Sequence, residues 1–389
     1  MSRLNLYFTE QKCLYLAVFL WSIYIVLVST IVWLQGHNHT VTPNYLIAAS
    51  HWLHGSDLYN SKGVGFIYLP QSSILFIPFA FIAKYSFGAA EVIWRIVSLG
   101  LFAYALLCFA HLFDANKVKK TFLIITIVSL PLAFSSARNG QFNIILSVLM
   151  LLSVCGVVKE RWWLVAFYLL LGFAFKPTMI ILLLLIFALY KPVRWRLIVG
   201  MVIFALVPFL TQNFHYVVSQ YLASAAMLNT AANLGMNTPI WAQFFGIMNQ
   251  MHVSIPDMWQ NVIRIIFAIL TLGCAWRAHK RYDMSLAVIF LYTFAACYLM
   301  LFNPRTEHND YVIMAPSLGI FLAWSFYVGR RYLGLFLTAL AVGIAFAGHY
   351  TFGSGYRHEY WSAPLFATMF VIVVLWYLYS SKAPARPTG

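Results

Sequence analysis

The stretch "CLYLAVFLWSIYIVLVSTIVWL", residues 13–34, has no charged side chain over its whole length. An uncharged apolar run of about 18 residues or more is long enough to cross a bilayer as a helix. Such runs recur along the 389 residues, of which 62% are hydrophobic and 9% charged. The sequence therefore predicts an all-α, polytopic membrane protein. Residues 13–34 are too long for a signal-peptide core and lack a small-x-small site after them, so we expect a retained first span.

The formal net charge of +15 raises the question of a nucleic-acid partner. The basic residues do not gather on one face, however, and instead form short runs between apolar segments. That distribution is typical of membrane topology, in which basic loops stay in the cytoplasm. We therefore expect a lipid bilayer as the surrounding medium and no nucleic acid.

The basic connections fix an in–out alternation if they are taken as cytoplasmic together with both termini. The remaining connections then lie outside: 35–91, 138–143, 176–177, 212–259, 303–310 and 351–360. This arrangement predicts about twelve spans in one membrane domain covering residues 1–389. The loops 35–91 and 212–259 would form the substrate-binding side, facing the periplasm or exterior of the plasma membrane.

Two segments do not fit simple crossings. A full crossing of "YLPQSSILFIPFAFIAK" (68–84) would place the basic residues 114–120 outside, so we expect a re-entrant or interfacial element. The segments 162–175 and 177–190 each reach roughly 21 Å, short of a hydrocarbon core of about 30 Å. We therefore expect a helix break at Lys176, on the floor of an aqueous cavity.

Ionisable groups near the outer ends of spans usually mark a functional path. The cations there are Arg95, Arg138, Lys176 and Arg305. Arginine and lysine could hold the phosphate of a lipid-linked sugar. Arg95 and Lys176 could equally form internal ion pairs. Gln141 and Asn143 could bond sugar hydroxyls or merely cap the turn "RNGQFN" (138–143).

The connection "FNPRTEHNDY" (302–311) gathers Arg305, Glu307, His308 and Asp310. An arginine suits a phosphate, and a carboxylate can remove the proton of an acceptor hydroxyl. Histidines at 37–39 and at 51–54 could share a metal, but no cysteine on the outer side supports one. The sequence also lacks nucleotide-binding and zinc-protease motifs. We expect neither a metal nor a cofactor.

The chain resembles the GT-C membrane glycosyltransferases, specifically glycosyltransferase family 87, which includes polyprenol-phosphate-mannose-dependent mannosyltransferases. Six segments carry the resemblance, in family order: "YLIAASHWLHGSDLYN" (45–60), "FIYLPQSSILFIPFA" (66–80), "NGQFNIIL" (139–146), "GFAFKPTMIILLLLIFALYKPVRWR" (172–196), "GMNTPIWAQFF" (235–245) and "NPRTEHNDYVIMAP" (303–316). Each motif alone is weak, and their order and spacing make the match specific.

The resemblance implies a GT-C helical bundle with juxtamembrane helices in the first external loop. It implies transfer of a mannose-like hexose or pentose from a polyprenyl-phosphate-linked sugar donor, with inversion, to a glycolipid or polysaccharide acceptor. Through their motifs it implies substrate-binding roles for Tyr45, Tyr59, Tyr68 and Asn237. His308 matches the histidine of the family segment that residues 303–316 resemble.

The family usually carries an aspartate, its proposed base, shortly before the tyrosine that opens the first-loop motif. This chain reads "VTPNY" (41–45) and has no carboxylate between Cys13 and Asp57. Asp57 could serve instead, as could Glu307 or Asp310 with His308 close by. A histidine from 37–54 is a further alternative. The protein could also have lost transfer and kept lipid binding.

Other function classes fit less well. An envelope polymerase or ligase of the O-antigen type relies on a large arginine-rich external loop, whereas residues 212–260 contain no lysine or arginine. A flippase or transporter of lipid-linked sugars needs polar groups through the cytoplasmic half of its spans, where charge is absent here. A glycosyltransferase is therefore the leading prediction.

Overall fold

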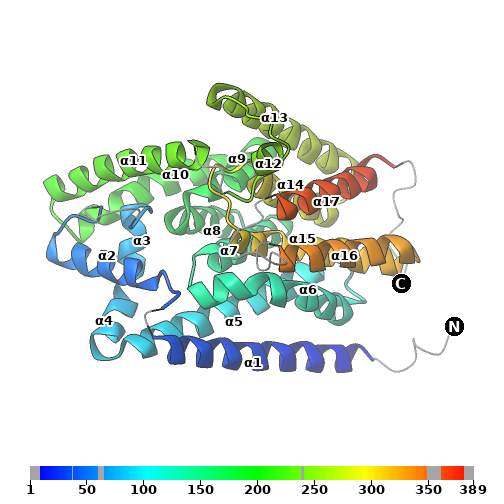
Figure 1. The fold of residues 1–389 in the computed structure, drawn as a ribbon, viewed down its shortest axis with the longest axis horizontal. Helices are drawn as coiled ribbons and strands as arrows, with labels where there is room; N and C mark the ends of the chain where they lie inside the picture. Colours follow the sequence, from blue (N-terminus) through cyan, green and yellow to red (C-terminus); the bar gives the residue numbers. More distant parts are fainter. Residues whose placement is uncertain (1–8, 37, 60–64, 238–240, 348–360, 381–389) are drawn as a thin grey trace. The chain divides into compact units, whose positions relative to one another are not determined.

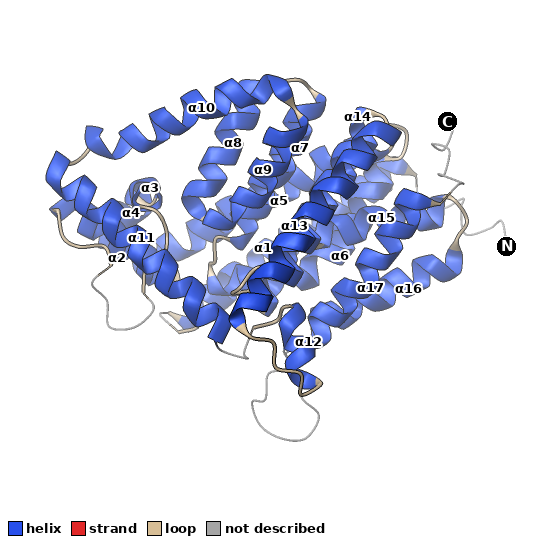
Figure 2. Ribbon diagram, turned by 90° about the horizontal axis from the view of Figure 1, so that it is seen from above, coloured by secondary structure: helices blue, strands red, loops and turns tan. Residues whose placement is uncertain are grey.

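The computed structural model describes residues 9–36, 38–59, 65–237, 241–347 and 361–380, with side chains of 232–237 excepted. Within these ranges every regular element is a helix (Figure 2). The all-α prediction is therefore confirmed.

Seven helical segments of the described chain are long and apolar enough to cross a membrane. They are α1 (Glu10–Gln35), α5 (Phe87–Phe113), α6 (Val118–Asn139), α10 with the following 3-10 turn η3 (Lys191–Leu210), α13 (Asp257–Arg281), α14 (Met284–Phe302) and α17 (Ser362–Tyr379). Shorter apolar helices include α7 (Asn143–Val158), α8 (Trp162–Phe175), η2 with α9 (Pro177–Leu189), α15 (Ala315–Tyr327) and α16 (Arg331–Phe346). The count of about twelve spans stays a prediction.

The chain divides into two compact units, each described by itself. The first-loop unit comprises Ile25–Leu101 and Ser135–Thr238, and the C-terminal unit comprises Met1–Tyr24, Phe102–Phe134 and Pro239–Gly389. All contacts reported below lie within one unit.

Three short helices occupy the first loop: α2 (Thr42–His54), α3 (Pro70–Leu75) and α4 (Ile77–Tyr85) (Figure 1). Prolines at the first turns of α3 and α4 interrupt the apolar run between them. At about 1.5 Å per residue neither helix can span a bilayer. The re-entrant or interfacial position of residues 68–84 stays a prediction.

Hydrogen bonds tie the first loop to the later helices of its unit. Trp52 Nε1 donates to Thr211 Oγ1 at 3.1 Å, and Gln71 Nε2 donates to the Phe204 carbonyl at 3.1 Å. The backbone amide of Leu58 donates to Gln220 Oε1 at 3.0 Å, on α11 (Phe214–Asn237). The loop therefore has a defined place against α10, η3 and α11.

In the C-terminal unit α14 forms the centre, packed by α13, α15 and α17. Its residues are almost all buried, and Tyr292 donates from its hydroxyl to the Ile313 carbonyl at 2.7 Å. The 3-10 segment η4 (His308–Ile313) joins α14 to α15, while α12 (Phe244–Gln250) precedes α13. The turn with Arg305 and Glu307 is thereby held at one end of α14 and α15.

Candidate active site

Lys176 lies at the predicted helix break. Because the following residue is proline, Lys176 leaves the helix and is extended, with φ −150° and ψ 115°. Its Nζ donates to Asn143 Oδ1 at 2.5 Å, and Asn143 Nδ2 donates to Gln141 Oε1 at 2.7 Å. Asn143 is buried, while Lys176 and Gln141 are half-buried. An ammonium and two amides are thus arranged in a row that can bond phosphate and hydroxyl oxygens.

An aromatic cluster surrounds this row. Phe142, between the two amides in sequence, stacks on Tyr45 with ring centroids 3.8 Å apart. Tyr68 and Phe175 pack on Phe142 at 4.9 and 5.0 Å, and the Tyr45 and Tyr68 hydroxyls are 3.3 Å apart. The structure therefore brings together five residues predicted for the site: Tyr45, Tyr68, Gln141, Asn143 and Lys176.

Tyr59 contacts this cluster through the backbone of Tyr68. Its hydroxyl donates to the Tyr68 carbonyl at 2.7 Å, and burial raises the pKa of Tyr59, which keeps the phenol protonated as a donor. Asp57 accepts the backbone N–H of Tyr59 at its Oδ1, at 3.0 Å, and is exposed. This is the contact of a turn-forming aspartate. The geometry gives Tyr59 a positioning role and Asp57 a role in the turn.

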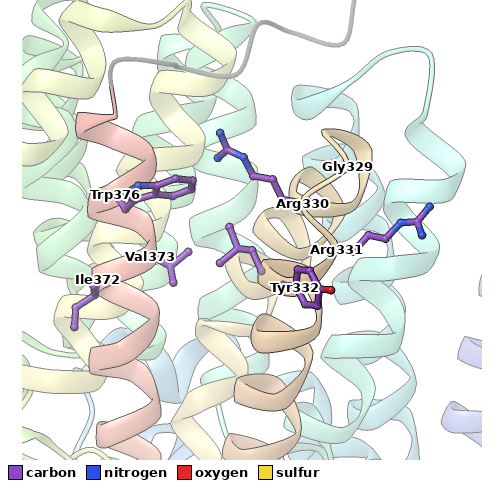
Figure 3. Close-up of a pocket in the computed structure, with 8 residues that line it drawn as sticks. Gly329, Arg330, Arg331, Tyr332, Ile372, Val373 and Trp376 are labelled. Atoms are coloured by element: carbon purple, nitrogen blue, oxygen red, sulfur yellow. The ribbon is translucent and has the colours of Figure 1, made fainter.

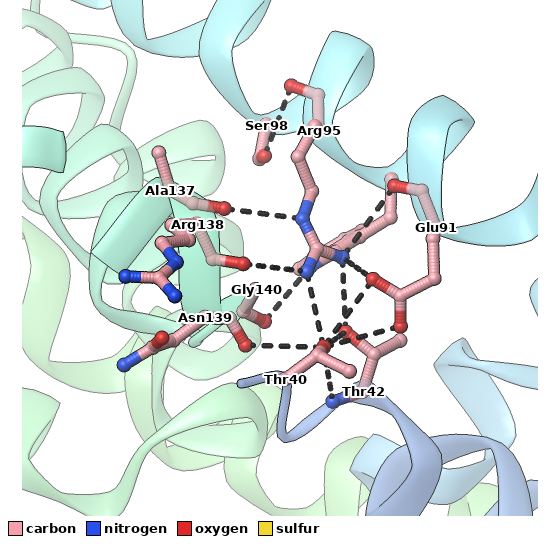
Figure 4. Close-up of polar contacts among 10 residues, drawn as sticks. Thr40, Thr42, Glu91, Arg95, Ser98, Ala137, Arg138, Asn139 and Gly140 are labelled. Atoms are coloured by element: carbon pink, nitrogen blue, oxygen red, sulfur yellow. Dashed lines mark hydrogen bonds and ion pairs between the residues drawn. The ribbon is translucent and has the colours of Figure 1, made fainter. Parts of the chain in front are cut away.

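Arg95 and Glu91, one turn apart on α5, form a buried ion pair with side chains 1% and 0% exposed (Figure 4). Thr40 Oγ1 donates to both Glu91 carboxylate oxygens, at 3.2 and 3.3 Å. The Arg95 guanidinium also donates, over 3.0 to 3.1 Å, to four oxygens: Thr40 Oγ1, Thr42 Oγ1, and the carbonyls of Ala137 and Arg138. All three guanidinium nitrogens are engaged internally. Of its two predicted roles, the geometry favours the ion pair over phosphate binding.

This network fixes the turn that presents Gln141 and Asn143. Gly140 has a φ of +68°, and an added Cβ would collide with Thr42 Oγ1 and the Arg95 guanidinium. Trp94 Nε1 donates to the Gly140 carbonyl at 3.0 Å. The predicted cation Arg138, in the same turn, donates from Nε to Gln35 Oε1 at 3.1 Å. The turn is therefore held from both sides by residues of its own unit.

An apolar groove of about 320 Å³ runs along α8, between α8, α10 and α3. Its lining reaches from Trp163, at the start of α8, to Ala174, two residues before Lys176. Gln71, three residues after Tyr68, borders the same groove. Helices α8 and α10 lie side by side along it (Figure 2). The groove has the apolar character that a lipid chain requires.

In the C-terminal unit, both predicted carboxylates lie at the start of η4, with Glu307 as its N-cap and Asp310 in its first turn. Asp310 Oδ2 accepts the Glu307 backbone N–H at 2.8 Å, and Glu307 in turn accepts from the backbone of the first turn, a reciprocal cap. Asn309 Nδ2 donates to Glu307 Oε2 at 2.8 Å. Asp310 is only 3% exposed, whereas Glu307 and the neighbouring His308 are half-buried. Both carboxylates cap the turn, but Asp310 is almost fully buried and Glu307 is not, so the geometry favours Glu307 over Asp310 as a base.

Arg305 lies over the Trp241 ring, with its guanidinium carbon 5.0 Å from the centroid. Its Nη1 is buried and has no hydrogen-bond partner among the described residues. Tyr311 holds the turn in place, since its hydroxyl donates to the Ala242 carbonyl at 3.0 Å. Burial, assisted by the Asp310 charge, raises the pKa of Tyr311 well above its ordinary value. The Nη1 group of Arg305 can therefore donate a hydrogen bond to a further acceptor.

The structure leaves two other predictions open. Asn237 ends α11, but its side chain lies outside the described residues. His51 and His54 each place Nδ1 at 2.8 Å from a carbonyl oxygen of their own segment. Within the described ranges no three potential metal ligands come together.

Sequence reasoning missed Thr40 and Thr42, and it did not place Phe142 at the centre of the aromatic cluster. Glu91 and Arg95, four residues apart in an apolar helix, gave a signal for their pairing. Nothing in the sequence links either residue to the two threonines, because that contact arises from the way the first loop folds over α5.

Comparison with known protein families identifies one match. The model of glycosyltransferase family 87 matches residues 66–304, which is more than half of the chain. No significant match was found among the curated proteins or among the solved structures.

Proposed function

The chain belongs to glycosyltransferase family 87, and on this premise we propose that it transfers a sugar from a polyprenyl-phosphate carrier to an acceptor hydroxyl. It is a membrane glycosyltransferase, as its family and its long apolar helices indicate. The sugar we propose is a mannose-like hexose or pentose, and the acceptor is a glycolipid or an envelope polysaccharide.

One observation carries the choice of a lipid-linked donor. The apolar groove along α8 ends two residues from Lys176, whose ammonium heads the row of amides. An isoprenoid chain in the groove would bring its phosphate to the lysine and its sugar to Gln141, Asn143 and Tyr68. A water-soluble nucleotide sugar would have no use for an apolar groove of this kind.

The proposed reaction is a single displacement. The acceptor oxygen attacks the anomeric carbon from the face opposite the phosphate, so the configuration inverts as the bond from that carbon to the phosphate oxygen breaks. In the first-loop unit, Lys176 is the proposed cation that stabilises the charge of the leaving phosphate. In the C-terminal unit, Arg305 is a second candidate cation, and Glu307, assisted by His308, is the candidate base that takes the proton of the acceptor hydroxyl.

A second function is favoured by the missing first-loop aspartate. Among the described residues, the carboxylate that contacts Thr40 is that of Glu91, which Arg95 holds in an ion pair. A protein that binds lipid-linked sugars without transferring them would need no base there. A flippase or transporter would instead move the intact lipid across the membrane.

The test uses purified protein in lipid nanodiscs with polyprenyl-phosphate sugars and a glycolipid extract as acceptor. Transfer predicts loss of the donor lipid, appearance of free polyprenyl phosphate and an inverted linkage in the product. Binding of the donor without its consumption would overturn the transferase proposal. Movement of intact donor between the leaflets of proteoliposomes would instead favour a transporter.

We also propose that about twelve spans place both termini in the cytoplasm and the site outside a plasma membrane. His54 and Glu160 are exposed and lie on opposite sides in this topology. A single cysteine at position 54 should react with an impermeant reagent in intact cells, and one at position 160 should not. The reverse labelling pattern would contradict the orientation.

A further inference from the structure

The connection between α15 and α16 borders a groove of about 660 Å³ against α17 (Figure 3). Its lining combines aliphatic, aromatic and basic side chains. These residues are Leu333, Ile372 and Val373, Tyr332 and Trp376, and Arg330 and Arg331. The combination is that of a lipid site, with a polar head and an apolar body.

The turn before α16 fixes the direction of Arg330. Gly329 has a φ of +76°, and the Arg330 backbone N–H donates to the Ser325 carbonyl at 2.8 Å. The guanidinium carbon then lies over the Trp376 ring, 4.4 Å from its centroid. Figure 3 shows Arg330 directed toward α17, whereas Arg331 points away on the other side of α16.

Three arginines lie at this end of α17: Arg277, Arg281 and Arg330. Arg330 Nη1 is buried without a hydrogen-bond partner among the described residues. Arg277 lies over Tyr379 at 4.6 Å, and Arg281 Nη2 donates to the Ser380 carbonyl at 2.5 Å. None of the three arginines forms a salt bridge within the described part of the chain. The buried Arg330 Nη1 therefore favours an anion as its acceptor, because a buried donor without a hydrogen bond is costly.

We propose that this groove binds an anionic diacyl phospholipid of the bilayer. The lipid phosphate accepts a hydrogen bond from Arg330 Nη1, and one acyl chain lies along Leu333, Ile372 and Val373. Tryptophan and tyrosine prefer the headgroup depth of a membrane, which suits Trp376 and Tyr332. Basic pockets between membrane helices are known to select acidic headgroups.

Within the C-terminal unit, the proposed lipid site is separate from the turn that holds Glu307. Helix α15 has 13 residues and begins after η4, whose N-cap is Glu307. At about 1.5 Å per residue it places Arg330 roughly 20 Å along its axis from that turn. The inference therefore stands whether or not the proposed transferase reaction is correct.

The test is native mass spectrometry of the full-length protein titrated with phosphatidylglycerol or with phosphatidylcholine of the same chains. Wild type should retain phosphatidylglycerol preferentially. Arg330→Gln should weaken its retention about tenfold or more, because it removes a charge-assisted hydrogen bond. Arg161→Gln is the matched control, because Arg161 is exposed and does not line the groove, and it should change retention by less than about fivefold, as a general surface charge does.

Equal losses in both variants would show diffuse attraction and overturn the site, as would equal retention of the two lipids by wild type. A second measurement does not depend on the Arg330 variant. Phosphatidylglycerol with brominated chains should quench tryptophan fluorescence more strongly than its phosphatidylcholine counterpart. Trp376→Phe should remove that excess, and an unchanged excess would place the lipid elsewhere.

Discussion

Arg95 and Lys176 belong to the same unit, one within α5 and the other directly after α8. Arg95 is 1% exposed, and its guanidinium bonds a carboxylate, two threonine hydroxyls and two carbonyls. Lys176 is half-buried, bonds the amide of Asn143 and follows the end of an apolar groove. Both are cations among apolar helices, but the groups around Arg95 favour a structural role, whereas we propose that Lys176 binds substrate.

The difference shows how support and binding can be told apart. A cation whose donors all meet protein oxygens stabilises the backbone that supplies them, as Arg95 does for the turn at Gly140. Lys176 follows the last groove-lining residue of α8 and bonds an amide, and we propose that it binds the donor phosphate. Glu307 and Asp310 differ only in burial, since both carboxylates cap the start of η4 while Asp310 is 3% exposed and Glu307 is half-buried.

The largest effect on stability is expected when the ion pair between Arg95 and Glu91 is broken. Arg95→Met leaves the Glu91 carboxylate buried without its partner and should destabilise the fold by about 3–5 kcal/mol. The double variant Glu91→Met with Arg95→Met should recover much of this loss, because no charge then stays buried. Thermal unfolding of the detergent-solubilised protein measures both. If Arg95→Met keeps the wild-type Tm, the support role is wrong.

The next largest effect concerns the carboxylates. Glu307→Gln should lower the rate of sugar transfer about 10²- to 10⁴-fold, as expected for loss of a general base. Its Tm should change little, because the amide oxygen of glutamine can still accept the capping N–H. Asp310→Asn should show the opposite pattern. The weakened cap should lower the free energy of unfolding by about 0.5–2 kcal/mol, and with it the Tm, while the rate stays within severalfold of wild type. Normal transfer by Glu307→Gln would remove it as the base.

A smaller effect should follow from the turn itself. Gly140→Ala adds a methyl group that collides with Thr42 and Arg95 at a φ of +68°, so stability should fall by about 1–3 kcal/mol. Gly100→Ala is the matched control, because nothing lies within 4 Å of its added Cβ. That control should keep or raise the Tm. Equal behaviour of the two variants would mean that the turn tolerates a side chain.

Much of the fold was predictable from local physics. Proline placed the break at Lys176 and interrupted residues 68–84, and the resemblance to glycosyltransferase family 87 is confirmed over residues 66–304. The count of spans stays a prediction, because several apolar helices are shorter than a bilayer is thick.

The candidate site was predictable only in part. Motif positions led to Tyr45, Tyr68, Gln141, Asn143 and Lys176, and these do come together. The sequence left open whether Arg95 binds phosphate or forms an ion pair, because a charge pattern does not show which oxygens surround a guanidinium. Those oxygens come from Thr40, Thr42 and two carbonyls, brought to Arg95 by tertiary packing.

The most direct test of the central claim is donor turnover by Lys176→Gln beside Lys191→Gln, an exposed lysine of the same unit. Consumption of polyprenyl-phosphate sugar in nanodiscs is measured for both variants, after thermal unfolding has shown that each keeps the Tm of wild type. We predict at least about a tenfold loss for Lys176→Gln, since a hydrogen bond to a charged group contributes about 1.5–3 kcal/mol, and no loss for the control. Equal turnover by the two variants would contradict the placement of the donor phosphate at Lys176.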